Sequence, residues 1–185
     1  MMAVPPRIAF TTKTIQLDAD SFCVYEWSTA IPSQTTPSEK KIKAPLIVLH
    51  HGAGSSALTF GLAAEKLAGM LADEAAVVVA FDCRGHGATV TADETLALDV
   101  LSNDLVRLVA AVRRDNDQEV VMVGHSMGGS IVVDACLKNV IPNVVGVAVV
   151  DVVEGTAIDS LSHMQSILKS RPSQFRSVED AIKWK

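Results

Sequence analysis

Short apolar runs alternate with amphipathic segments along most of this chain. The runs at residues 46–49, 76–81, 120–123 and 144–150 are rich in valine, alanine and leucine, which predicts strands buried on both faces. Residues 58–71, 96–114 and 130–137 carry apolar side chains at helical spacing and predict helices. Strands and helices that alternate in this order predict an α/β fold with a doubly wound, mostly parallel sheet.

The first two predicted helices differ in their sequence signals. The serine pair at 55–56 can cap the first helix, which runs through Leu58, Leu62, Leu67 and Leu71 at helical spacing. The second helix carries a stripe of leucines, which places Asp104 and Arg107 on its outward face.

The two ends of the chain differ from the predicted sheet. Residues 14–27 alternate loosely between apolar and polar positions, which predicts a two-stranded antiparallel hairpin with its turn at 18–21. After Asp151 the chain becomes rich in serine, lysine, arginine and glutamine. We therefore expect residues 1–153 to form the core and residues 154–185 to belong to a different region.

Composition narrows the class of protein. A chain of 185 residues is long enough for one domain with its own core. The net charge of −5 argues against nucleic acid or an anionic membrane as the main partner. The three cysteines are isolated, which fits a reducing compartment and predicts no structural zinc. No secretory signal or run of roughly 20 apolar residues is visible, so we expect a cytoplasmic, or also nuclear, protein without a membrane span.

The strongest chemical signal is a serine between a predicted strand and a predicted helix. Residues 124–128 read Gly-His-Ser-Met-Gly, the G-x-S-x-G pattern of a nucleophile elbow. Gly124 and Gly128 are expected to shape the site, because side chains there would collide with the neighbouring strand and helix. Ser126 is the predicted nucleophile, and such a serine needs a histidine base, an acid and donors for the oxyanion.

Donors for the oxyanion are predicted after an earlier strand. Residues 50–54 read His-His-Gly-Ala-Gly, and we expect the backbone amides of Ala53 and Met127 to hold the oxyanion, with Gly52 and Gly54 shaping the turn. One alternative is a glycine turn that leads a helix and binds nothing. Another is a dinucleotide site, because residues 52–57 match G-x-G-x-x-G/A formally, but that alternative leaves the serine unexplained.

Asp151 is the predicted acid. It follows the strand at 144–150 and comes after Ser126, in the chain order serine, acid, histidine. Its carboxylate could instead cap the next segment or pair with a lysine. The charged residues of the turn at 82–87 are expected to tie loops together beside the site rather than to act in catalysis.

None of the five histidines has the features of a triad base. Two lie in the predicted oxyanion turn, His86 lies in the turn at 82–87, and His125 is expected to point away from the serine. Only His163 follows Asp151, on a segment that is helical by pattern, whereas the base needs a loop after a later strand. The sequence therefore presents a nucleophile and an acid without a suitable base.

Four segments carry a family resemblance: residues 51–58, 82–87, 124–129 and 151–157. Together they resemble the protein phosphatase methylesterases, α/β hydrolases that remove the methyl ester from the C-terminal leucine of the type 2A protein phosphatase catalytic subunit. The last segment, Asp-Val-Val-Glu-Gly-Thr-Ala, separates this family from ordinary esterases and lipases. The resemblance implies Ser126 as nucleophile and Asp151 as triad acid, and nothing in this chain matches the family's catalytic histidine.

The resemblance implies a carboxylesterase on a shortened fold. We expect an α/β-hydrolase core that stops before the cap and the last strands, with residues 154–185 as the start of the cap region. Ser126 would act without cofactor or metal, the phosphatase would be the partner, and the chain without its histidine is expected to be inactive. Two alternatives stay open: an esterase of small molecules, and a non-catalytic fragment that binds the phosphatase.

Overall fold

The computed structural model describes residues 9–28, 44–72, 76–152, 170, 172 and 174–184. They belong to two compact units, Met1–Val152 and Val153–Lys185. The strands of the first unit are β1 (Phe10–Leu17), β2 (Asp20–Ser28), β3 (Leu46–His50), β4 (Val77–Phe81), β5 (Val120–His125) and β6 (Val144–Val150). Its helices are η1 (Ala57–Phe60), α1 (Gly61–Met70), α2 (Leu98–Val112) and α3 (Met127–Leu137), and the second unit contains α5 (Val178–Lys183).

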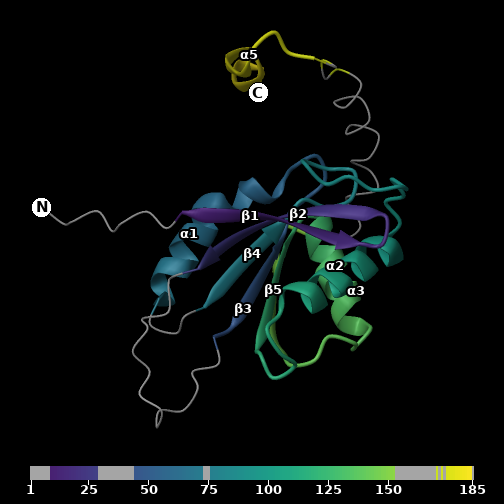
Figure 1. The fold of residues 1–185 in the computed structure, drawn as a ribbon. Coiled ribbons are helices and arrows are strands. Elements are labelled where there is room, and N and C mark those ends of the chain that lie inside the picture. The colour runs from purple at the N-terminus through teal and green to yellow at the C-terminus, as the bar shows by residue number, and fades with distance from the viewer. Residues whose placement is uncertain are drawn as a thin grey trace, which may run out of the picture. The chain divides into compact units, whose positions relative to one another are not determined.

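One six-stranded sheet organises the first unit, with the strand order β1-β2-β4-β3-β5-β6. The hairpin β1–β2 is antiparallel and joins β4 antiparallel, whereas β4, β3, β5 and β6 run parallel to one another. The predicted mostly parallel α/β sheet is therefore confirmed, together with the predicted antiparallel hairpin. Figure 1 shows the helices on both sides of this sheet.

The two faces of the sheet are covered by different helices. Helices α2 and α3 pack on one face, in a cluster that includes Leu46, Leu105 and Ile131. Helix α1 packs on the other face, in a cluster that includes Trp27 and Leu49. All five residues of β3 are buried, as expected for a central parallel strand covered on both sides.

Helix α1 buries only part of the face that its leucines suggest. Leu67 and Leu71 are partly buried against the sheet cluster, whereas Leu58 and Leu62 are exposed. Ala64 and Ala68 are fully buried there. Alanine lets a helix backbone lie close to a sheet, because no long side chain separates them. The 3-10 turn η1 precedes the helix, and Ser56 occupies its N-cap position as predicted, but the Ser56 side chain makes no capping hydrogen bond.

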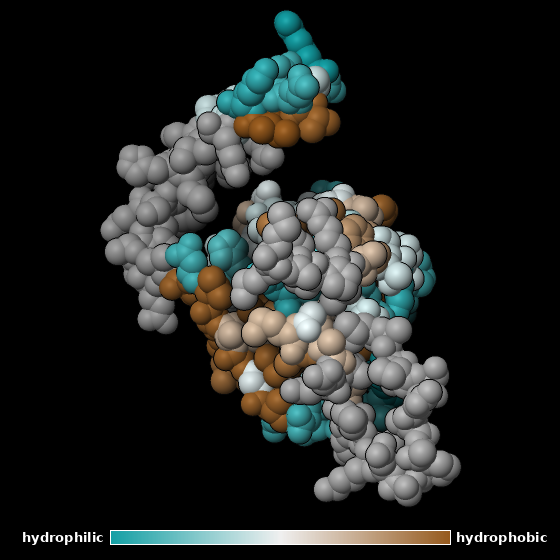
Figure 2. All heavy atoms as spheres, turned by 90° about the vertical axis from the view of Figure 1, so that its left-hand side faces the viewer, coloured by the Kyte–Doolittle hydropathy of each residue, from teal (hydrophilic) through white to brown (hydrophobic). Residues whose placement is uncertain are grey.

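Strand β6 forms one edge of the sheet and presents apolar side chains to solvent. Val145, Val147 and Val149 are all exposed. Figure 2 shows apolar residues gathered on part of the surface of the first unit. Among the described residues, no helix is long and apolar enough to cross a membrane.

Candidate active site

Ser126 lies in a sharp turn between β5 and α3. Its backbone angles are φ 52° and ψ −121°, a combination that L-residues rarely adopt. Two backbone hydrogen bonds hold the turn: the Ser126 amide donates to the carbonyl oxygen of Val150 at 2.9 Å, and the Gly129 amide donates to the Ser126 carbonyl at 2.8 Å. The fold therefore keeps an exposed serine in a strained conformation at the carboxyl end of β5.

Close backbone contacts surround this serine. A Cβ atom added to Gly124 would lie 2.2 Å from the carbonyl oxygen of Gly128, and one added to Gly128 would lie 2.2 Å from the carbonyl oxygen of His50. Real Cβ contacts essentially never fall below 3.0 Å. The turn can therefore approach β3 this closely only because both positions are glycine.

The turn after β3 lies directly against Ser126. A Cβ atom added to Gly52 would be 3.0 Å from the Cβ of Ser126. The amide of Ala53 follows in this turn, and the amide of Met127 begins helix α3, where the positive end of the helix dipole lies. Neither amide has a hydrogen-bond acceptor within the described part of the chain. Two donors beside a serine oxygen can stabilise the oxyanion of acyl transfer.

Two histidines brace this turn instead of serving as bases. His51 donates from Nδ1 to the Gly52 carbonyl at 2.8 Å and accepts from the Cys83 amide at Nε2, at 3.0 Å. His86 accepts from the Gly54 amide at Nε2, at 3.0 Å, with Nδ1 2.8 Å from the Arg84 carbonyl. Burial also lowers the pKa of His51. Both rings therefore fasten the turn after β3 to the turn that follows β4.

His50 lies deeper than these two rings. Burial lowers its pKa to about 4, so it stays neutral near pH 7. Its Nδ1 lies 3.0 Å from the His51 carbonyl oxygen, and its buried Nε2 has no partner among the described residues. This side chain belongs to the floor of the site and does not reach the exposed serine.

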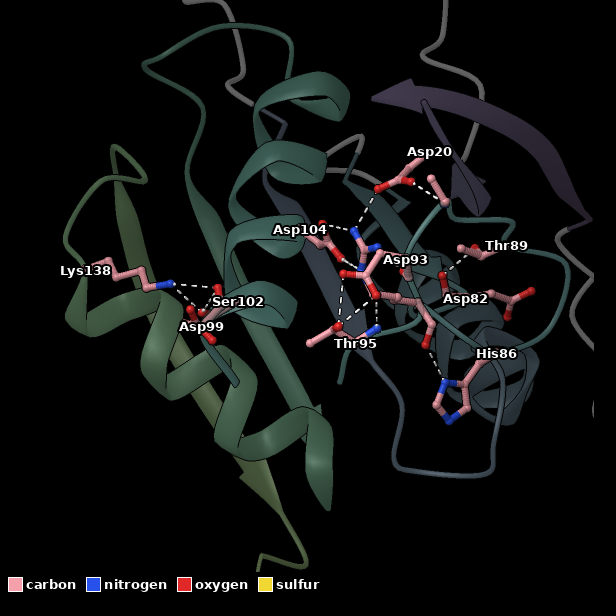
Figure 3. A network of polar contacts seen from close by, with 12 residues as sticks. Asp20, Asp82, His86, Thr89, Asp93, Thr95, Asp99, Ser102, Asp104 and Lys138 are labelled. Atoms are coloured by element: carbon pink, nitrogen blue, oxygen red, sulfur yellow. Dashed lines mark hydrogen bonds and ion pairs between the residues drawn. The ribbon is translucent and has the colours of Figure 1, made fainter. Parts of the chain in front are cut away.

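Asp82 and Arg84 tie loops together. Figure 3 shows part of the polar network around Asp20, Asp82 and Asp104. The Asp82 carboxylate accepts from the amides of Ala57 and Ala88 at 2.8 and 2.9 Å. Arg84 pairs with both Asp20 and Asp104 at 2.8 Å, and these carboxylates raise the pKa of the buried guanidinium. The prediction that Asp104 faces outward is wrong, because a buried arginine from another segment draws it inward.

Asp151 lies at the carboxyl end of β6, beside the serine turn. It has φ 54°, and its side chain is 76% exposed. Nε2 of His125 lies 3.9 Å from Asp151 Oδ2. Because β3, β5 and β6 are parallel, their carboxyl ends lie on the same side of the sheet. Gly52, Ser126 and Asp151, which follow these ends, are therefore brought to that side. His163 lies outside the described residues.

The His125 ring lies between Gly52 and Asp151, a position that the sequence analysis did not predict. Its expected direction, away from the proton of Ser126, stays a prediction. The parallel register pairs His125 with Val150, one residue before Asp151. A prediction of which strands are neighbours would have revealed this contact, and hydrophobic spacing alone does not.

Comparisons with known proteins identify the family. Residues 47–183 match the alpha/beta hydrolase family. Protein phosphatase methylesterase 1 of Yarrowia lipolytica is 42% identical over 168 residues, which cover 81% of this chain and 40% of the relative. The Schizosaccharomyces pombe and Mus musculus proteins of the same name are 41% and 39% identical, over 75% and 77% of this chain and 41% and 36% of theirs. The chain thus spans about two fifths of the length of these relatives.

Solved structures support the fold. E-2-(acetamidomethylene)succinate hydrolase matches with a TM-score of 0.73 at 20% identity, over 95% of this chain and 57% of that one. Epoxide hydrolase I of potato matches with a TM-score of 0.58 at 21% identity, over 76% of this chain and 39% of that one. The resemblance to phosphatase methylesterases is confirmed at the level of relatives, and the chain belongs to the alpha/beta hydrolase family.

Proposed function

We propose that this chain carries the nucleophile half of a serine carboxylesterase. The observation that carries the proposal is the strained, exposed Ser126 beside Gly52, with the amides of Ala53 and Met127, which have no acceptor among the described residues, next to these two positions in the chain. Backbone strain at an exposed serine is characteristic of functional sites, because nothing in packing alone requires it. Asp151, at the end of the adjacent strand, is the proposed triad acid.

In the proposed reaction the Ser126 oxygen attacks the carbonyl carbon of a methyl ester while a histidine accepts the serine proton. The Ala53 and Met127 amides hold the negative oxygen of the tetrahedral intermediate. The histidine returns the proton to the departing methoxide, and methanol leaves. Water then cleaves the acyl-enzyme in the same way. Asp151 would orient the histidine, for which the described residues offer no candidate.

The proposed substrate is the methyl ester on the C-terminal leucine of the type 2A protein phosphatase catalytic subunit. The relatives named protein phosphatase methylesterase 1 support a phosphatase substrate, at 39–42% identity. The phosphatase is then also the protein partner. A cytoplasmic or nuclear location belongs to the same proposal, supported by three cysteines that are all free.

A second candidate is a non-catalytic fragment that binds the phosphatase. The exposed carboxylate of Asp151, with no histidine at hydrogen-bond distance among the described residues, favours this alternative. A small-molecule esterase would keep the same serine chemistry but need no protein partner.

Labelling with a fluorophosphonate probe tests the proposal, because the probe reacts with activated serines only. The catalytic proposal requires that the folded 185-residue chain is labelled and that the labelling disappears in Ser126→Ala, whereas a serine without a base would not react. Hydrolysis of a methylated C-terminal phosphatase peptide, compared with a short-chain ester, then separates the two esterases. A folded chain that binds phosphatase but neither labels nor hydrolyses would contradict the catalytic proposal and support the binding fragment.

A further inference from the structure

We infer that His125 is a positioning residue, which holds the carboxylate of Asp151 in place relative to Ser126. This inference rests on the proposed function, in which Asp151 is the acid of the site. It assigns a role to the residue that precedes the nucleophile, beyond the glycines and amides that shape the turn.

The first observation is where the two ring nitrogens of His125 lie. Nε2 is 3.9 Å from Oδ2 of Asp151. Nδ1 is buried without a hydrogen-bond partner among the described residues, and it would be 3.1 Å from a Cβ atom on Gly52. The ring therefore fills the space between the turn after β3 and the acid at the end of β6.

The second observation is that Asp151 has little else to hold it. Its side chain is 76% exposed. Asp151 directly follows Val150, which pairs with His125 in the parallel register of β5 and β6. Among the described residues, no other basic group forms an ion pair with this carboxylate. An exposed carboxylate without a partner samples several rotamers. Binding to a catalytic base restricts it to one rotamer, and this restriction costs conformational entropy.

These contacts suggest how the ring acts. An imidazole with a proton on Nε2 attracts the carboxylate, and rotation of the exposed Asp151 side chain can shorten the distance of 3.9 Å to that of a hydrogen bond. A carboxylate accepts through both oxygens, so Oδ2 can rest on His125 while Oδ1 remains available to orient a catalytic base. The buried Nδ1 side of the ring, wedged at Gly52, gives the carboxylate a fixed support.

Nuclear magnetic resonance of the imidazole nitrogens in the 185-residue chain tests this contact. In the unchanged chain we expect His125 to carry its proton on Nε2. In Asp151→Gly we expect His125 to populate both tautomers, so that the Nε2 resonance moves toward the average of the shifts of the two tautomers. Asp18→Gly is the matched control, because Asp18 is also an exposed aspartate with positive φ, 57° against 54°. Glycine adopts such angles without strain, so both variants keep the backbone. An Asp151→Gly spectrum identical to that of the unchanged chain overturns the inference.

Two substitutions of His125 separate positioning from simple space filling. The side-chain nitrogen of glutamine can reach the position of Nε2, whereas that of asparagine is too short. We expect the three-bond couplings of Asp151 to report one dominant χ1 rotamer in the unchanged chain and in His125→Gln, and averaged rotamers in His125→Asn. Averaged couplings already in the unchanged chain would overturn the inference. None of these measurements uses ester hydrolysis, so a chain that fails to label at Ser126 refutes the proposed function without deciding this one.

Discussion

The strain at Ser126 predicts that one substitution destroys the nucleophile and stabilises the protein. A non-glycine residue in such a backbone conformation costs about 1–3 kcal/mol. Ser126→Gly removes this strain. Glycine also makes the unfolded chain more flexible, which lowers the free energy of unfolding by about 0.4–1 kcal/mol. The serine side chain is exposed, so loss of its hydroxyl has little effect on packing. We therefore expect Ser126→Gly to be about 1 kcal/mol more stable than Ser126→Ala, which keeps the strain.

Guanidinium unfolding followed by the fluorescence of buried Trp27 measures this difference. A gain of about 1 kcal/mol corresponds to a rise in melting temperature of about 2–4 °C for a chain of this size. Ser130, exposed in helix α3, provides the matched control with the same pair of substitutions. There glycine must be the less stable variant, by about 1 kcal/mol. Equal stabilities of the two Ser126 variants would refute the claim that the turn stores strain.

Three further predictions concern the surroundings of the site. Gly128→Ala places a Cβ atom 2.2 Å from a backbone carbonyl oxygen, so we expect the free energy of unfolding, measured with denaturant, to fall by about 1–3 kcal/mol. The control Gly61→Ala, whose Cβ atom meets nothing within 4 Å, should lose no stability. Equal effects of the two substitutions would contradict the clash. The pKa of His50 is about 4 in the folded protein and about 6.5 in the unfolded chain. The neutral ring therefore contributes on the order of 3 kcal/mol to the free energy of unfolding above pH 6.5, and this contribution is lost as the pH falls through 4. The unfolding midpoint measured across this range should vary less with pH in His50→Gln, and an unchanged dependence would argue against the neutral ring. Arg84→Met leaves a buried aspartate unpaired and should cost about 3–5 kcal/mol, whereas Arg107→Met, at an exposed pair, should cost under about 1 kcal/mol, so similar unfolding midpoints would rule out the buried pair as a major contributor.

The strands could be predicted from sequence because each buried parallel strand is a short, nearly continuous apolar run. This holds for β3 and β4, whose residues are all buried. The serine turn could be predicted too, because its glycines are required by close backbone contacts that any such turn makes.

The incorrect predictions concern side chains whose burial depends on a segment distant in sequence. Asp104 has the spacing of a solvent-facing residue, yet it is buried because it pairs with Arg84, which also pairs with Asp20. Leu62 has core spacing, yet it is exposed because the sheet sits against the alanines of α1. Periodicity predicts that a helix has an apolar face, but the distance between layers decides which residues form it.

The position of β3 in the middle of the sheet affects how the chain is made. β3 needs β4 on one side and β5 on the other, and β5 ends 75 residues after β3, at His125. At a synthesis rate of about 5–20 residues per second, one edge of this apolar strand stays open for on the order of 4–15 s. An open apolar edge is where nascent chains pair with one another. The yield of the protein in an expression host therefore depends on what shields residues 46–50 during those seconds, independently of how stable the finished sheet is.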